Sequence, residues 1–258
     1  MSLDSSFIYD PIAIVLFLVS LSLAPFIILM ITSYVKLVIV MNLIRQAMGL
    51  QQIPPNMIIN GLAIILSLYI MAPIMQESIH RAVEINQQFK LRKQNPNSFS
   101  LPEKFKAYHD TSQLSNTLLS ALSSDNEQGL NDTKALLNYL KEPITQFLLQ
   151  HTTQKQSQFF IQVAKRLWPN QYKQEIKRDN LLICVPAFIL SELTSAFEIG
   201  FLIYLPFIAI DLVVSNILLA MGMMMVSPMT ISLPFKLMLF VLVNGWSKLV
   251  EALLLTYA

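Results

Sequence analysis

Runs of apolar residues near both ends of the chain enclose a long polar segment. Residues 12–31 and 58–76 carry no charge, and each run of about 20 residues is long enough to cross the hydrocarbon core of a membrane. A second apolar block covers residues 181–258. The pattern predicts apolar helices in two blocks, 1–76 and 181–258, on either side of a polar region, 77–180.

The polar region shows no strand-type alternation and no internal repeat, and its apolar residues recur at helical spacing. Asp132 is placed to cap a helix that runs to Leu140, and Pro143 suits the first turn of the next helix. Thr152 or Thr153 is placed to cap a third helix. We therefore expect a small helical domain here.

Charges and prolines interrupt the second apolar block. Two straight spans, near 199–220 and 231–250, would place Asp211 in mid-membrane, where a charge costs at least about 2.5–3.5 kcal/mol. Proline-broken helices that pack against protein explain the block better. The prediction is an all-α, multi-helix membrane-type protein with proline-broken apolar helices in its two blocks.

Composition agrees with this fold class. Hydrophobic residues make up 54% of the 258, and charged residues only 13%, against roughly 25% in an average soluble domain. The net charge of +2 is too small to indicate a nucleic-acid partner. Cys184 is the single cysteine, so no disulfide framework is expected.

The start of the chain lacks the basic segment of a signal peptide, so we expect a retained first helix. The short connector 32–57 carries Lys36 and Arg45 and no acidic residue. The positive-inside rule then places this connector in the cytoplasm and the region 77–180 outside it. Lys36 and Arg45 are interpreted as cytoplasm-facing anchors.

No sequence signature of a zinc protease, an α/β-hydrolase, a P-loop or a dinucleotide-binding fold occurs. The histidines, His80, His109 and His151, all lie in the polar region. We predict no catalytic residue, no cofactor and no metal. A small-molecule or ion transporter is the alternative class, although no inverted repeat of the kind transporters use is visible.

Methionine is concentrated in the stretch AMGMMMVSP, residues 220–228, and five of the chain's 13 methionines lie between Met221 and Met229. Consecutive helical side chains point about 100° apart, so three in a row cannot share one packing face. Gly222 and Pro228 bracket the run, and both disfavour a continuous helix. A loop between two apolar helices is predicted, with ordinary core packing of the methionines as the alternative.

Three stretches carry a resemblance to a known family. PAFILSELTSAFEIGFLIYLPFIAIDLVVSNILLAMGMMMVSPMTISLPFKLMLFVLVNGW, residues 186–246, resembles the signature region of the FliP/SctR family, the core export-apparatus proteins of type III secretion systems. Residues 32–76 resemble the family's N-terminal half, and FLLQHTTQKQSQFF, residues 147–160, resembles the stretch before the second block. Segment 90–135 has no counterpart and is interpreted as an expanded external loop.

The resemblance implies a homo-oligomer of five copies, joined by SctT/FliR-type and SctS/FliQ-type membrane proteins. It implies passage of unfolded proteins across the bacterial inner membrane, with 77–180 on the periplasmic side. Flagellar members usually begin with a signal peptide, so the injectisome branch is favoured. Family members commonly carry a second proline at Ser227, an acid at Asn244, a basic residue at Thr194 and a neutral residue at Glu198.

A fivefold ring of thioethers would form an apolar, deformable seal of the kind that gates channels by dewetting. The predicted gate residues are Met221, Met223, Met224 and Met225, and the predicted hinges of the gate loop are Gly222 and Pro228. Charged residues in apolar segments usually face protein or a cavity and find partners. We expect pairing between subunits for Glu192, Glu198, Asp211 and Lys236.

Overall fold

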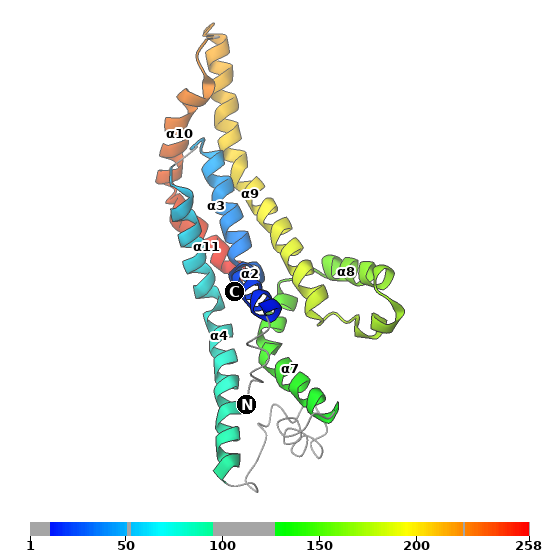
Figure 1. Ribbon diagram of the computed structural model, residues 1–258. Coiled ribbons are helices and arrows are strands. Elements are labelled where there is room, and N and C mark those ends of the chain that lie inside the picture. The colour runs from blue at the N-terminus through cyan, green and yellow to red at the C-terminus, as the bar shows by residue number, and fades with distance from the viewer. Residues whose placement is uncertain (1–10, 51–52, 95–126, 224, 258) are drawn as a thin grey trace. The chain divides into compact units, whose positions relative to one another are not determined.

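The protein is described by a computed structural model that covers residues 11–50, 53–94, 127–223 and 225–257. These residues form helices and no strand, which confirms the all-α fold (Figure 1). The helices are α2 (Pro11–Ile31), α3 (Tyr34–Ala47), α4 (Asn56–Gln94), α7 (Glu127–Gln150), α8 (Gln154–Leu167), the 3₁₀ helix η1 (Asn170–Glu175), α9 (Leu181–Ala220), α10 (Pro228–Leu242) and α11 (Gly245–Leu255).

The chain forms two compact units. The first consists of residues 1–71 and 151–258, and the second of residues 72–150. In the first unit α9 is the central element, because α3, α8 and α10 all pack along it (Figure 1). Its buried residues recur every three to four positions, as one face of a helix requires. They include Cys184, Phe188, Glu192, Ala196 and Gly200.

The contact between α3 and α9 is close because glycine allows it. A Cβ added at Gly200 would lie 2.3 Å from the Cδ1 atom of Leu43. Residues Leu37, Val40, Met41 and Ile44 of α3 are fully or almost fully buried and form the centre of the apolar core. A small residue on one helix thus lets a branched residue of the other reach its backbone.

The end of α3 follows the sequence prediction. Gly49 adopts a left-handed conformation, with φ of 78°. Its N–H donates to Gln46 O, and the N–H of Leu50 donates to Arg45 O, which together form a Schellman ending. The Arg45 guanidinium bonds to Pro54 O and Asn56 Oδ1, so it braces the connection to α4.

Interior prolines end fewer helices than the sequence predicts. Helix α9 continues through Pro186 and Pro206, and α7 continues through Pro143. The predicted helix start at Asp132 is also wrong, because α7 begins at Glu127 and runs past it. A proline removes one helical hydrogen bond, and a helix embedded among apolar neighbours tolerates that loss. In the second block, the chain breaks before Pro228 and at Asn244 instead.

Helices α10 and α11 bend by 61° relative to each other and together form what we call the α10–α11 arm, residues 228–257. The bend occurs at Asn244, which has a positive φ of 52°. Next to it, a Cβ on Gly245 would lie 2.3 Å from the Phe240 ring. The Phe240 ring packs edge-on against Trp246, with centroids 5.4 Å apart. The bend is therefore closely packed.

The second unit contains the C-terminal part of α4 and α7. Arg81 of α4 forms ion pairs with Glu77 and Glu142, and donates to the carbonyl of Tyr139 at 3.1 Å. Its guanidinium also lies 4.8 Å from the centroid of the Tyr139 ring. A single arginine thus joins the two helices of this unit through several charge-assisted contacts.

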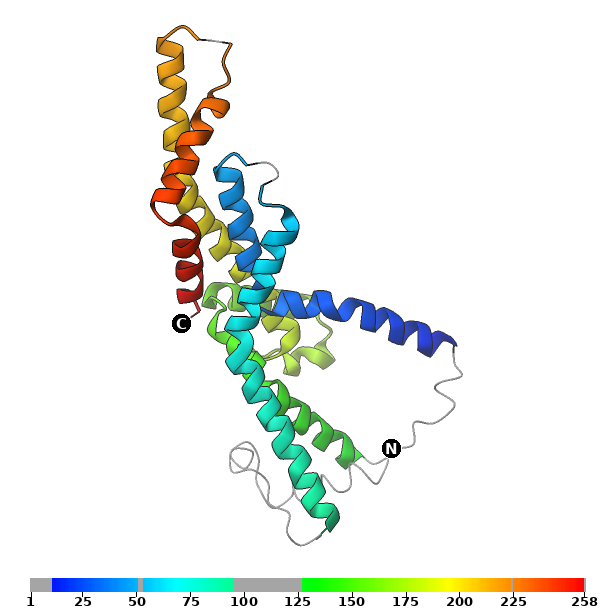
Figure 2. The same cartoon turned by 90° about the vertical axis from the view of Figure 1, so that its left-hand side faces the viewer.

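Among the residues that the structure describes, three helices are long and apolar enough to cross a membrane: α2, the first part of α4, and α9. The bent pair of α10 and α11 forms a fourth if it counts as one span. Helix α2 projects from the rest of its unit (Figure 2), and its apolar window is entirely unburied. A helix this apolar and this exposed needs lipid or another protein around it.

Candidate gate loop and buried ion pairs

The methionine run lies in the loop between α9 and α10. Helix α9 ends in a second Schellman motif, in which the N–H of Gly222 donates to Leu219 O and that of Met223 to Leu218 O, both at 3.0 Å. Gly222 has φ of 72°, a conformation that glycine adopts without strain. Pro228 occupies the first position of α10, where a missing N–H removes no helical bond.

The loop exposes its thioethers. Met221 is 64% exposed, Met223 46%, and Met225 fully exposed. Met224 lies outside the described residues. Since Met in a folded interior is normally among the more buried residue types, packing within this chain does not account for these side chains.

Lys36 and Glu192 form a buried ion pair at the centre of the first unit. Lys36 Nζ lies 3.0 Å from Glu192 Oε1, and the two residues are 4% and 1% exposed. The pair joins the first turn of α3 to the N-terminal third of α9. Removal of one member would leave an uncompensated buried charge, which typically costs about 3–5 kcal/mol.

Two aromatic side chains complete this cluster, which we call the Lys36–Glu192 cluster. The hydroxyl of Tyr257 donates to Glu192 Oε2, and the Tyr257 ring lies under Lys36 Nζ, 4.2 Å from the ring centroid. The His151 ring packs against that of Tyr257 at 60°, with centroids 5.0 Å apart. Burial first, and the Glu192 carboxylate second, raise the pKa of Tyr257, so the phenol stays a donor.

Burial lowers the pKa of His151 below its ordinary value, and the nearby Lys36 ammonium lowers it further. Next to this residue, the N–H and hydroxyl of Thr153 both bond to Ser191 Oγ, at 2.9 and 3.0 Å. Ser191 immediately precedes Glu192 in α9. The start of α8 is therefore fixed to α9 directly beside the Lys36–Glu192 cluster.

Lys236 and Asp211 form a second ion pair, nearer the methionine loop. Lys236 Nζ lies 2.6 Å from Asp211 Oδ2 and donates to Ala47 O at 3.1 Å. Ser232 donates to the other carboxylate oxygen at 2.6 Å. The lysine side chain is 3% exposed and the aspartate side chain 40% exposed. The ion pair thus joins α9 and α10 to the end of α3.

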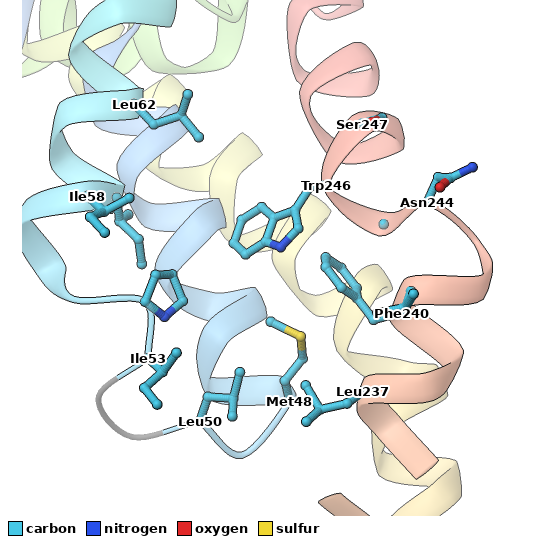
Figure 3. A pocket seen from close by; sticks show the side chains of 14 residues that line it. Met48, Leu50, Ile53, Ile58, Leu62, Leu237, Phe240, Asn244, Trp246 and Ser247 are labelled. Atoms are coloured by element: carbon cyan, nitrogen blue, oxygen red, sulfur yellow. The ribbon is translucent and has the colours of Figure 1, made fainter. Parts of the chain in front are cut away.

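An apolar groove of about 670 Å³ lies between the α3–α4 connection and the bend of the α10–α11 arm (Figure 3). Met48, Leu50 and Ile58 line one wall, and Leu237, Phe240 and Trp246 line the other (Figure 3). Asn244 and Ser247 contribute its few polar side chains. Within the part of the chain that the structure describes, no group of three or more potential ligands could hold a metal ion.

Comparison with known proteins decides the family. The family model described as "FliP family" matches residues 17–253. The chain belongs to the FliP family. This FliP-family protein is 46% identical over 248 residues to the Yop proteins translocation protein R of Yersinia pestis, covering 96% of this chain and 97% of that protein. The relatives place it in the injectisome branch.

Two other relatives are similar over almost their whole length. The virulence protein YscR of Salmonella typhimurium is 41% identical over 252 residues, covering 96% of this chain and 98% of that protein. The hypersensitivity response secretion protein HrcR of Ralstonia nicotianae is 39% identical, covering 95% and 96%. The FliP-family protein is accordingly a component of a type III secretion export apparatus. Its family is one of structural components of that apparatus and is not a known enzyme family.

The structure places the predicted charged residues within one chain as follows. Glu192 pairs with Lys36, Asp211 pairs with Lys236, and Glu198 lies exposed on α9. Pairing between subunits stays a prediction for these four residues. The interpretation of Lys36 as a cytoplasm-facing anchor is wrong, because its ammonium is buried against Glu192.

Sequence reasoning missed Tyr257 and His151. Tyr257 lies beyond the stretches that carry the family resemblance, and His151 lies within the stretch 147–160 but in the polar region, where the sequence pattern assigns it no partner. A signal existed: Glu192 and Lys36 are isolated opposite charges in apolar segments, and such charges require polar partners. Any tyrosine or histidine at the border of an apolar segment is a candidate for that role.

Proposed function

We propose that this FliP-family protein is a pore-forming subunit of the type III export gate, and that its methionine loop seals the channel through which unfolded proteins cross the inner membrane. The observation that carries the proposal is the loop itself. It presents exposed thioethers between two well-formed helix ends. Those ends hold the loop in place, while Met221, Met223 and Met225 present their side chains to the surroundings of the chain.

Thioether side chains suit such a seal for a physical reason. They are apolar, so a narrow ring of them excludes water and ions. They are also unbranched and polarizable, so the ring can deform around many different side chains of a passing polypeptide. Gly222 and Pro228 would serve as the hinges of this loop.

A ring requires several copies of the chain, and we propose five, in contact with SctT/FliR-type and SctS/FliQ-type proteins. The exposed apolar surface supports this assembly, because α2, α9 and the α10–α11 arm all expose large apolar side chains. The apolar groove next to Trp246 adds further apolar surface that a neighbouring copy could cover. Such surfaces exceed what a monomer usually exposes.

We propose further that residues 77–180 lie on the periplasmic side. Since Lys36 is buried in an ion pair, the positive-inside argument depends on Arg45 alone in the connector 32–57. The proposed periplasmic position of residues 77–180 is therefore supported mainly by membership of the FliP family.

Ion leak through the assembled gate tests the proposal. Alanine at Met221, Met223, Met224 and Met225 together should raise leak across the inner membrane several-fold, while the assembled complex can still be purified. Alanine at Met229 and Met238, which are exposed to a similar degree on α10, is the matched control and should leave leak unchanged. Equal leak in the two variants would contradict a methionine seal.

A further inference from the structure

The α10–α11 arm connects the methionine loop to the Lys36–Glu192 cluster. It begins at Pro228, directly after the loop, and Tyr257 lies in the turn that follows α11. Between these ends, Lys236 ties α10 to Asp211 and Ala47 O, and Phe240 packs against Phe207 of α9 with centroids 6.5 Å apart. How firmly the arm is held at its far end therefore affects the segment that carries the loop.

Tyr257 contacts groups from three other parts of the chain. Its hydroxyl donates to Glu192 of α9, its ring lies on the ammonium of Lys36 of α3, and His151, which precedes α8, packs against its ring. Tyr257 therefore contacts both members of the ion pair, Glu192 through its hydroxyl and Lys36 through its ring, which a purely apolar side chain could not do.

Each part of the tyrosine has a separate effect on that pair. Lys36 takes one oxygen of the Glu192 carboxylate, and the hydroxyl of Tyr257 takes the other. A buried carboxylate that loses a donor still bears the free-energy cost of desolvation, but no longer has the hydrogen bond that offset it. The ring attracts the ammonium through its quadrupole and covers the side of Lys36 that it lies against.

We infer that Tyr257 is a positioning residue, which seals the Lys36–Glu192 pair with both its hydroxyl and its ring and thereby locks the α10–α11 arm onto α3 and α9. The seal is a property of the single chain. Its consequence for the methionine loop rests on the proposed function, and the two are tested separately below.

Chemical labelling of lysine amines tests the seal directly. In the purified protein, Lys36 should resist a membrane-permeable amine reagent, whereas Lys248, with a side chain 72% exposed, should react and serves as the internal standard. Tyr257→Leu removes the ring and should speed labelling of Lys36 about tenfold, the factor that corresponds to a lost contact with a charged group. Tyr257→Phe keeps the ring and should leave Lys36 protected.

The hydroxyl is tested by the pH dependence of thermal unfolding. Four titratable groups face one another here: Lys36, Glu192, His151 and Tyr257. The loss of a donor costs an ionised carboxylate more than a protonated one, so the melting temperature of Tyr257→Phe should fall furthest below that of the wild type near neutral pH, and the difference should shrink as the pH falls. Tyr69→Phe, which removes the hydroxyl of an exposed tyrosine on α4, should leave the profile unchanged.

Two results would overturn the inference. Lys36 that stays protected in Tyr257→Leu would show that the ring does not cover it, and a Tyr257→Phe profile identical to that of Tyr69→Phe would show that the hydroxyl does not hold the carboxylate. Measurements of ion leak distinguish the role of Tyr257 in holding the α10–α11 arm from the role of the methionine loop in sealing the channel. Exposed Lys36 with unchanged leak in Tyr257→Leu would refute the coupling of the arm to the loop, while leaving the methionine variants as the test of the gate.

Discussion

Lys236 and Asp211 form an ion pair in which burial is very unequal. The lysine side chain is 3% exposed and the aspartate side chain 40% exposed, at an N–O distance of 2.6 Å. The two members of the pair therefore have different alternatives when the partner is lost: the carboxylate still reaches water, and the ammonium does not.

This asymmetry predicts unequal effects of neutralising each member. Asp211→Asn removes the counter-charge of a buried ammonium and leaves it only neutral acceptors such as Ala47 O, so it should cost about 2–3 kcal/mol of folding free energy, below the 3–5 of a fully buried pair. Lys236→Met leaves a carboxylate that water can solvate, and should cost no more than about 1 kcal/mol. Thermal unfolding of the two purified variants gives the comparison, and the reverse order of stabilities would contradict it.

A side chain at Gly200 should push α3 and α9 apart. Its Cβ would lie 2.3 Å from Leu43 Cδ1 and 3.3 Å from Leu43 Cβ, so a change of the Leu43 rotamer would relieve the first contact but leave the second tighter than usual. We expect Gly200→Ala to destabilise the protein by about 1–3 kcal/mol. Leu43→Ala should restore part of that loss in the double variant, because it removes the clashing atoms. Additive losses in a double-mutant cycle of unfolding free energies would exclude this steric origin.

Alanine at Gly222 should disturb the gate loop without creating a clash. Nothing lies within 4 Å of the added Cβ, but φ of 72° is strained for a residue with a side chain, by about 1 kcal/mol. Gly61 of α4 also has open space around it and lies within a helix, so Gly61→Ala should be neutral or slightly stabilising. In measurements of ion leak and thermal stability, Gly222→Ala should raise the leak and lower the stability, and Gly61→Ala should do neither.

Acidification should weaken the contacts around His151. Its pKa in the folded protein is lowered, so the unfolded chain binds more protons than the folded chain as the pH falls below the ordinary value of about 6.5. Stability contributed by neutral His151 is therefore complete above that pH and is lost as the pH falls through the lower, folded value. His151→Gln should flatten the melting temperature between pH 7 and pH 5. His80→Gln, on the exposed surface of α4, is the control and should retain the wild-type slope.

Local patterns in the sequence predicted much of the secondary structure. Gly49 ends α3 through a left-handed turn, α8 begins after Thr153, and the methionine run forms a loop between Gly222 and Pro228. Each of these depends on the conformational preference of one or two residues, which the sequence displays directly.

Features set by distant parts of the chain could not be predicted in this way. The prolines at 143, 186 and 206 leave their helices unbroken because packing outweighs one lost hydrogen bond. The partner of Glu192 lies in a different apolar block, and Tyr257 reaches the same carboxylate from a third segment. Hydropathy marks these charges as needing partners, and only the fold decides which ones they find.

The Lys36–Glu192 pair also sets an order of events during synthesis. A ribosome adds about 5–20 residues per second, so roughly 8–30 s pass between the emergence of Lys36 and that of Glu192. Throughout that interval the first apolar block holds an ammonium group whose carboxylate does not yet exist. The buried pair can form only after α9 has been made, so the core that joins the two apolar blocks is completed late.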